Sequence, residues 1–92
     1  MMKSIQEGSI VESTAGKDKG AHYVVTALGP APYCQVTDGR RRSMAKQKRK
    51  NMRHLYCLGQ SERLRALLME HKPIGDEKIR EVLNELTRIQ EG

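Results

Sequence analysis

The stretch Gly8–Gly39, GSIVESTAGKDKGAHYVVTALGPAPYCQVTDG, alternates short strand-forming runs with turn residues. Val, Ile, Thr and Tyr, which suit a pleated and half-buried surface, are concentrated in 9–14, 21–29 and 33–37. The first two runs are separated by AGKDKG, in which Gly16 and Gly20 permit a tight connection, and GPAP separates the second from the third. The stretch therefore predicts three short strands joined by turns.

Two further strands are predicted downstream. Asp38-Gly39 is a strong two-residue hairpin signal, because a type I′ turn needs positive φ at both positions. It predicts that RRRSM at 40–44 returns as the fourth strand, and HLYCLG at 54–59 reads as the fifth. Five short strands punctuated by glycine turns predict a small barrel.

The last third of the chain has helical spacing. Ser61 is the predicted N-cap of a helix over 62–72, which Pro73 ends, and Asp76 is the predicted N-cap of a second helix within 74–90. The second helix has one apolar stripe. The stripe consists of Ile79, Val82, Leu83, Leu86 and Ile89 or Gln90. We expect a helical hairpin that packs on the barrel and enlarges its thin core, or that docks onto another protein.

Positive charge is concentrated before the helices. Residues 1–59 hold eleven Lys or Arg against four acids, whereas 60–92 hold six against seven, within a total net charge of +6. Between Arg40 and Arg53 there are eight Lys or Arg and no acid. Because unopposed cations repel one another, such a segment indicates a polyanionic partner rather than a solvated loop. A membrane surface is disfavoured, since the segment has no amphipathic helical periodicity.

No set of reactive groups points to catalysis or to a cofactor. Asp38 is accounted for by the predicted turn, and Asp18 lies between Lys17 and Lys19, where we expect a local ion pair. The three His and two Cys match no metal-binding spacing, so Cys34 and Cys57 are predicted to be free thiols. No apolar run approaches the roughly 20 residues of a membrane span, and the start lacks a signal-peptide core. We expect a cytoplasmic, non-enzymatic protein of one domain.

The strand, glycine loop and second strand of GSIVESTAGKDKGAHYVVTAL, followed by YCQVTDG, resemble a KOW motif. The succeeding RRR, KRKN and HL resemble the archaeal and eukaryotic large-subunit ribosomal protein family fourteen. The chain is most similar to the bacterial family of KOW domain-containing, ribosomal-protein-like RNA-binding proteins. There a PKxKNxKHL-like segment and a short acidic helical tail follow the barrel, and KQKRKNMRHL matches that segment except that Gln47 stands where proline is common.

This resemblance implies an SH3-like five-stranded KOW barrel over 1–59, with its basic segment at 40–53, and a helical extension over 60–92. It also implies RNA binding, with ribosomal RNA and the large subunit as the expected partners. We expect phosphate contacts on structured RNA, because three Tyr and no Phe or Trp offer little for base stacking. The candidate RNA-binding residues are Lys17, Lys19, Arg40, Arg41, Arg42, Lys46, Lys48, Arg49, Lys50, Asn51, Arg53 and His54.

Two of these residues and the function itself have alternatives. Asn51 either bonds a base edge or 2′-hydroxyl, or caps a turn, and His54 either donates to a phosphate or faces solvent. A protein-interaction KOW module of the transcription or translation machinery predicts an exposed apolar groove on the barrel. A general nucleic-acid chaperone predicts equal affinity for DNA and RNA.

Overall fold

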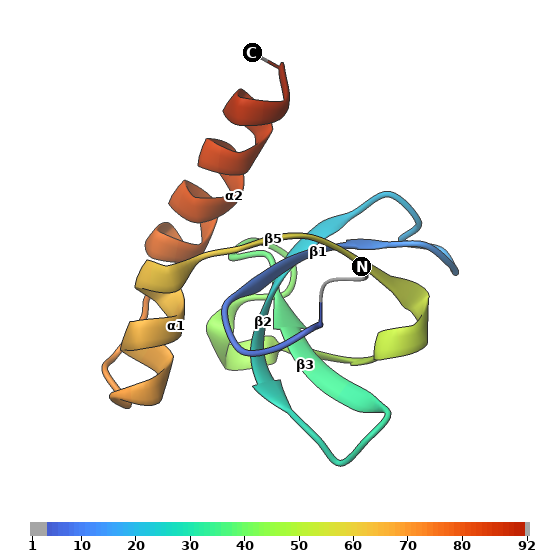
Figure 1. The fold of residues 1–92 in the computed structure, drawn as a ribbon, viewed down its shortest axis with the longest axis horizontal. Coiled ribbons are helices and arrows are strands. Elements are labelled where there is room, and N and C mark those ends of the chain that lie inside the picture. The colour runs from blue at the N-terminus through green and yellow to red at the C-terminus, as the bar shows by residue number, and fades with distance from the viewer. Residues whose placement is uncertain (1–3, 92) are drawn as a thin grey trace.

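The computed structural model describes residues 4–91 of the chain, with side chains up to residue 86. In this part of the chain a sheet is followed by helices, as Figure 1 shows, and two short 3₁₀ turns flank the fourth strand. The elements are β1 (Ser9–Ser13), β2 (His22–Leu28), β3 (Tyr33–Thr37), η1 (Met44–Lys46), β4 (Lys48–Asn51), η2 (Met52–His54), β5 (Leu55–Gln60), α1 (Glu62–Met69) and α2 (Asp76–Glu91).

The five strands form one antiparallel sheet in the order β4-β3-β2-β1-β5. The two edge strands, β4 and β5, are joined by only the three residues of η2. In a flat sheet they would lie about 19 Å apart, whereas the connection reaches about 14 Å at most. The sheet is therefore strongly curled (Figure 1), although no ladder between β4 and β5 closes it in the described part of the chain.

Both faces of this curled sheet are buried at its centre. Alternate residues point to opposite faces of a strand, so Val11, Tyr23 and Val25 line the inside of the curl while Ile10 and Val24 face outward. The inner cluster is completed by Cys34, Val36 and Leu55. The apolar runs in the first two strands are continuous because each run serves two cores.

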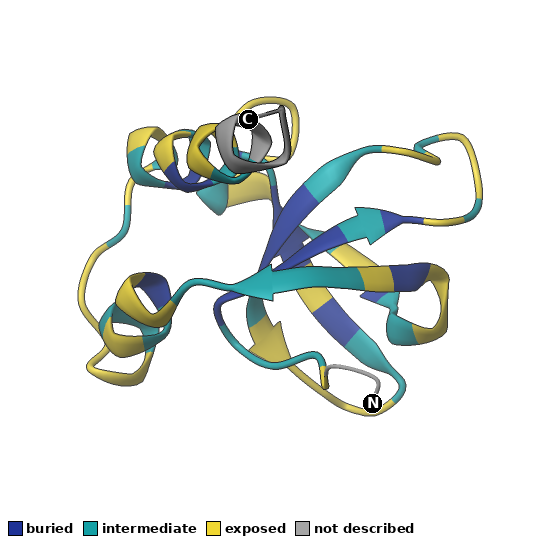
Figure 2. Ribbon diagram, turned by 45° about the horizontal axis from the view of Figure 1, so that its top comes forward, coloured by how far each residue is buried: buried dark blue, intermediate teal, exposed yellow. Residues whose placement is uncertain are grey.

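The outer core lies between the sheet and the helices. Leu64 of α1 and Ile79 and Val82 of α2 are buried against Ile10 and Val24. Figure 2 shows that each helix turns a buried side toward the sheet and an exposed side to solvent. The chain is thus a small mixed α/β domain with an antiparallel five-stranded sheet and two helices. Of the predicted stripe, Leu83 and Leu86 also pack here, while Ile89 and Gln90 lie outside the described side chains.

The prediction for the fourth strand is wrong. Residues 40–44 are not a strand, and the strand that pairs with β3 is Lys48–Asn51. Asp38-Gly39 does not form a two-residue hairpin, because the Asp38 carboxylate accepts the backbone N–H groups of Arg40 and Arg42 and shapes a longer loop. The Thr37 hydroxyl donates to the Arg42 carbonyl and closes that loop.

Both helix caps were tested by the structure, with different results. Ser61 caps α1 as predicted, since its Oγ accepts the Leu64 N–H at 3.2 Å. That helix ends at Met69 rather than at residue 72, because His71 adopts a left-handed φ of 55° and the Lys72 N–H returns to the Leu67 carbonyl. Asp76 lies in the first turn of α2, and its carboxylate accepts the Met44 N–H at 2.7 Å instead of capping its own helix.

Candidate nucleic-acid interface

The loop 38–46 carries four exposed cations on a backbone that is held from two sides. Within the loop, the Asp38 carboxylate accepts the Arg40 N–H. From α2, Arg80 donates to the Gly39 carbonyl at 2.7 Å, and the Asp76 carboxylate accepts the Met44 N–H. Gly39 has φ 72°, and a Cβ there would lie 2.6 Å from the Asp76 carbonyl oxygen. The close approach of α2 therefore requires glycine. The exposed cations of this loop are Arg40, Arg41, Arg42 and Lys46.

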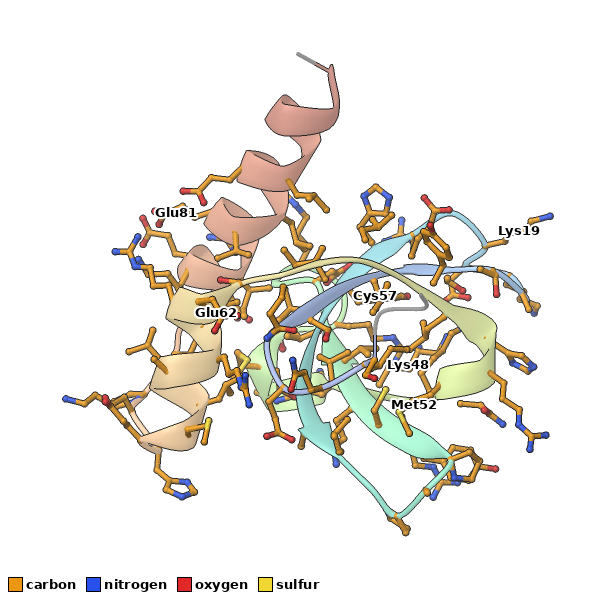
Figure 3. The ribbon with its side chains drawn as sticks, in the orientation of Figure 1. Lys19, Lys48, Met52, Cys57, Glu62 and Glu81 are labelled. Carbon is orange, nitrogen blue, oxygen red and sulfur yellow. The ribbon has the colours of Figure 1, made fainter. Side chains whose placement is uncertain are left out.

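The basic residues of β4 are divided between two faces. Lys48 and Lys50 point into the curl and reach Asp18 at 3.2 Å and 2.8 Å, whereas Arg49 is exposed on the outside. The side chain of Lys50 is only 9% exposed. Figure 3 shows Lys48 within the curl, in contrast to Lys19 at the tip of the β1–β2 loop. The alternation of strand residues thus turns two predicted RNA-binding cations toward the protein interior.

Asp18 is the acceptor at the centre of this inner network. The expected pairing of Asp18 with Lys17 and Lys19 is wrong, because its carboxylate instead accepts hydrogen bonds from Lys50, Tyr23, Ser13 and Lys48. Burial disfavours the charged carboxylate, but these four hydrogen bonds outweigh it and hold the pKa of Asp18 well below its ordinary value. The carboxylate is therefore charged, and it ties the β1–β2 loop to β4.

Lys17 and Lys19 flank Asp18 on the β1–β2 loop. Both are exposed, while Asp18 between them reaches the inward-pointing lysines of β4. Gly16 and Gly20 bracket the loop with φ of 85° and 92°, which only glycine adopts readily. A shared RNA-binding face of these two cations with residues 40–53 stays a prediction.

The outer face of β3 and β4 holds a contact that the sequence analysis missed. The Arg49 guanidinium carbon lies 4.5 Å from the centroid of the Tyr33 ring. Gln35 is paired with Arg49 and Tyr33 with Asn51 in the strand register, so these four side chains share one face. Strand alternation within YCQ and KRKN could have predicted that Tyr33 and Gln35 share one face, as do Arg49 and Asn51. The register between the two strands is also needed to place Arg49 over the Tyr33 ring.

Asn51 and His54 lie at the two ends of η2. The Asn51 side-chain oxygen accepts the Arg53 N–H at 2.9 Å, so the prediction that Asn51 caps a turn is confirmed. His54 is exposed, as is Arg53, and the His54 backbone carbonyl accepts the Thr14 N–H. A contact from either side chain to RNA stays a prediction.

The helices carry several exposed glutamates, in contrast to the cations of residues 40–53. The exposed residues of α2 include Glu77, Glu81 and Glu85, and Glu62 begins α1. In Figure 3, Glu62 and Glu81 lie on the helical side of the molecule, away from Lys19 and Lys48. The described residues thus carry exposed cations on the β1–β2 loop, on loop 38–46 and on β4, and exposed glutamates on the helices, with loop 38–46 packed against α2.

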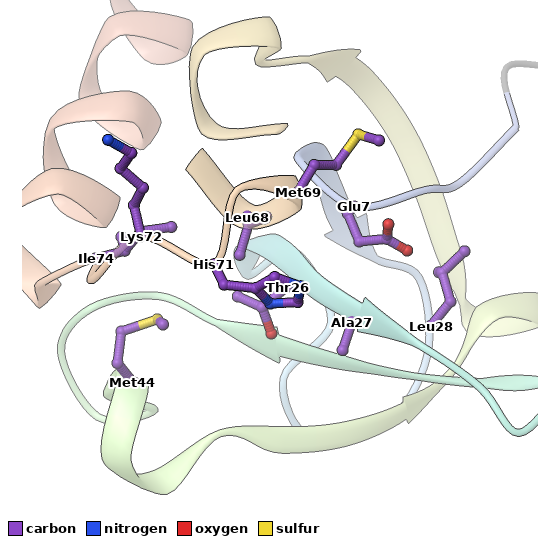
Figure 4. A pocket seen from close by; sticks show the side chains of 10 residues that line it. All are labelled: Glu7, Thr26, Ala27, Leu28, Met44, Leu68, Met69, His71, Lys72 and Ile74. Carbon is purple, nitrogen blue, oxygen red and sulfur yellow. The ribbon is translucent and has the colours of Figure 1, made fainter. Parts of the chain in front are cut away.

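A pocket of about 610 Å³ opens between the end of α1, η1 and β2. Leu68 and His71 face Thr26 and Ala27 across it, and Met44 closes one side (Figure 4). Leu28 and Met69 at its rim are exposed apolar side chains. The pocket therefore offers an apolar surface next to the basic loop.

The thiols and the other potential metal ligands of the described residues do not form a cluster. Cys34 is buried, which raises the pKa of its thiol to about 11, and Cys57 is likewise a free thiol. No group of three or more His, Cys, Asp or Glu side chains that could hold a metal ion occurs in the described residues. None of the described helices combines the length and apolar character that crossing a membrane requires.

No protein-family model matches the chain, and no curated protein matches its sequence. The resemblance to the KOW families stays a prediction, carried by the residues quoted for it.

Proposed function

We propose that this chain is a cytoplasmic, non-enzymatic RNA-binding protein of the ribosomal-protein-like KOW type, which binds structured RNA through phosphate contacts. One observation carries the proposal. Six exposed cations between residues 40 and 53 form no ion pair with any acid in the described part of the chain. They are Arg40, Arg41, Arg42, Lys46, Arg49 and Arg53.

The electrostatics of this surface favour a polyanion. The nearest acid in sequence, Asp38, already accepts two backbone N–H groups, and Asp18 is occupied by Lys48 and Lys50. The exposed cations are therefore not neutralised within this surface. Arg is well suited to phosphate, because its planar guanidinium can donate two parallel hydrogen bonds. Phosphate contacts of this kind position a protein on RNA without reading its sequence.

The SH3-like barrel is part of the proposal. It is supported by the strand order, in which β5 returns to pair with β1, and by the curl that η2 imposes on the two edges. The inner core of Val11, Val25 and Val36 lies inside this curl, as the interior of a small barrel would. The glycine loop of the KOW resemblance is the β1–β2 connection, whose Asp18 reaches β4.

A second candidate is a protein-interaction KOW module of the transcription or translation machinery. The pocket between α1, η1 and β2, with exposed Leu28 and Met69 at its rim, favours it. This candidate predicts weak, steeply salt-sensitive RNA binding and a protein ligand on the apolar pocket. The charge surface supports the first candidate more directly, because its cations form no ion pair within the described residues.

The test is RNA binding by two variants with the same change of charge. Arg40→Gln with Arg41→Gln removes two cations from the basic loop, and Arg63→Gln with Lys72→Gln removes two exposed cations from the helical side. With a ribosomal RNA stem-loop as ligand, we expect the first pair to weaken binding about tenfold and the second to change it less than twofold. Equal losses would contradict the proposed surface, and equal affinity for duplex DNA would indicate a general nucleic-acid chaperone.

A further inference from the structure

Among the cations of residues 40–53, Arg49 is the one that stacks on an aromatic ring in the described part of the chain. Tyr33 is the first residue of β3, and the register pairs it with Asn51, so Arg49 is its diagonal neighbour on the same face. Long side chains and aromatic rings meet across such a diagonal. The guanidinium lies over the ring at 4.5 Å, and this cation–π contact limits the directions that the Arg49 side chain can take.

The surroundings of this pair are polar and open. Gln35 beside it is exposed, and Asn51 uses only its carbonyl oxygen, which accepts from Arg53. The Asn51 amide N–H groups have no partner in the described part of the chain, and Arg49 forms no ion pair there. The face therefore combines a planar cation stacked on an aromatic ring with an amide donor, and the exposed Arg53 follows Asn51 two residues later in η2.

We infer that this outer face of β3 and β4 binds one unpaired RNA base, stacked against the Arg49–Tyr33 pair. The inference rests on the proposed function, and it names the RNA feature that the protein selects: a bulged or looped-out base within structured RNA. Unpaired bases stack on aromatic side chains and on Arg guanidinium planes. Asn51 donates to an acceptor on the base edge or to the 2′-oxygen, while Arg53 holds the adjoining phosphate.

The other tyrosine that is open to solvent shows what such a face requires. Tyr56 on β5 is 62% exposed, more than Tyr33, but its register partner on β1 is Glu12. A carboxylate beside a ring repels the phosphates that accompany any base, and no cation is stacked on Tyr56 in the described part of the molecule. Tyr56 therefore serves as a matched control for substitutions of Tyr33.

The experiment uses two RNA hairpins with the same stem, one fully paired and one carrying a single bulged 2-aminopurine, whose fluorescence falls when it stacks. For the wild-type chain we expect about tenfold tighter binding of the bulged hairpin, together with quenching. Arg49→Lys keeps the charge but loses the plane, so it should bind both hairpins with similar affinity. Tyr33→Leu should do the same, whereas Tyr33→Phe, Tyr56→Leu and Arg63→Lys should retain the preference.

The outcomes separate the inference from the function on which it rests. If the wild-type chain binds both hairpins equally and without quenching, the stacking site is wrong while phosphate binding stands. Retention of the preference by Arg49→Lys and Tyr33→Leu, both folded by circular dichroism, also overturns the site. Failure of the wild-type chain to bind either hairpin contradicts the proposed function itself.

Discussion

At the scale of single residues, Asp18 is the acceptor that ties the β1–β2 loop to β4. Its carboxylate is 17% exposed and accepts from two lysines, a tyrosine and a serine, and Lys50 is more deeply buried than Asp18 itself. A buried ion pair adds little net stability relative to apolar residues, but loss of one partner leaves a charge without compensation. We therefore expect removal of the Asp18 carboxylate to destabilise the folded chain, because Lys50 would stay buried without a counter-charge.

We expect Asp18→Asn to lower the free energy of unfolding by about 3 kcal/mol, because Lys50 would keep its burial and lose its counter-charge. Urea denaturation followed by circular dichroism measures this loss. Glu85→Gln is the control, since it removes an exposed carboxylate that has no ion pair in the described part of the chain. A loss below about 0.5 kcal/mol for Asp18→Asn would mean that the network does not contribute to stability.

The same residue predicts a dependence of stability on pH. The pKa of Asp18 in the folded chain is held below its ordinary value of 3.8, so the unfolded chain takes up the proton first as the pH falls. The stability that Asp18 contributes is complete above about pH 4 and is lost progressively at lower pH. Urea midpoints between pH 6 and pH 2 should fall more steeply for the wild-type chain than for Asp18→Asn. Parallel profiles would contradict this origin of acid sensitivity.

At the scale of the elements, periodicity predicted most of what the structure contains. Strands β1, β2, β3 and β5 lie where β-branched runs and glycine turns indicated them, and both helices follow from their apolar spacing. The fourth strand was predicted at the wrong place because Asp38-Gly39 is compatible both with a two-residue hairpin and with the longer loop that the structure shows. The hairpin signal is local, whereas the actual loop depends on α2, whose Arg80 and Asp76 hold it from a distance in sequence.

The candidate site was predictable only in part, for a related reason. The exposed cations of loop 38–46 follow from composition, and strand alternation within KRKN separates Lys48 and Lys50 from Arg49 once the strand is known. The pairing of Asp18 with those lysines and the position of Arg49 over Tyr33 depend on how distant segments meet. Spacing within one segment does not contain that information.

Gly39 tests the packing of α2 on the basic loop. We expect Gly39→Ala to destabilise the chain by more than about 1 kcal/mol, because an alanine meets both an unfavourable φ and the Asp76 carbonyl. Gly20→Ala is the matched control, since Gly20 also has a positive φ but no atom within 4 Å of the added Cβ. Urea unfolding should show the larger loss at Gly39. Equal losses would mean that the contact with α2 does not constrain the loop.

At the scale of the whole molecule, the exposed cations are concentrated in residues 40–53 and exposed glutamates lie on the helices. Loop 38–46, β4 and η2 carry the exposed cations of residues 40–53, while α2 carries the exposed Glu77, Glu81 and Glu85. Figure 3 labels Glu81 among them. Exposed cations attract a polyanion and exposed carboxylates repel it, so these charges favour approach through residues 40–53. The helices also bury the outer face of β1 and β2 around Ile10 and Val24, so they stabilise the sheet and leave the outer face of β3 and β4 open.

This distribution predicts the salt dependence of binding. If the six exposed cations each neutralise one phosphate, log K should fall with log salt concentration with a slope of about −4 to −5. Arg40→Gln with Arg41→Gln should reduce the magnitude of the slope by about 2, whereas Arg63→Gln with Lys72→Gln should leave it unchanged. Fluorescence anisotropy between about 50 and 200 mM salt provides the slopes. A slope near zero for the wild-type chain would contradict phosphate-driven binding.

The proposed association with the ribosome is tested most directly by sedimentation of the native chain from cell lysate through a sucrose gradient, at low and then at raised salt. The account predicts that the chain migrates with the large subunit or its precursor and persists at moderate salt, and that Arg40→Gln with Arg41→Gln shifts it toward the top. Cross-links from residues 40–53 to ribosomal RNA would then locate the contact. A wild-type chain that stays at the top under both conditions would contradict ribosome association.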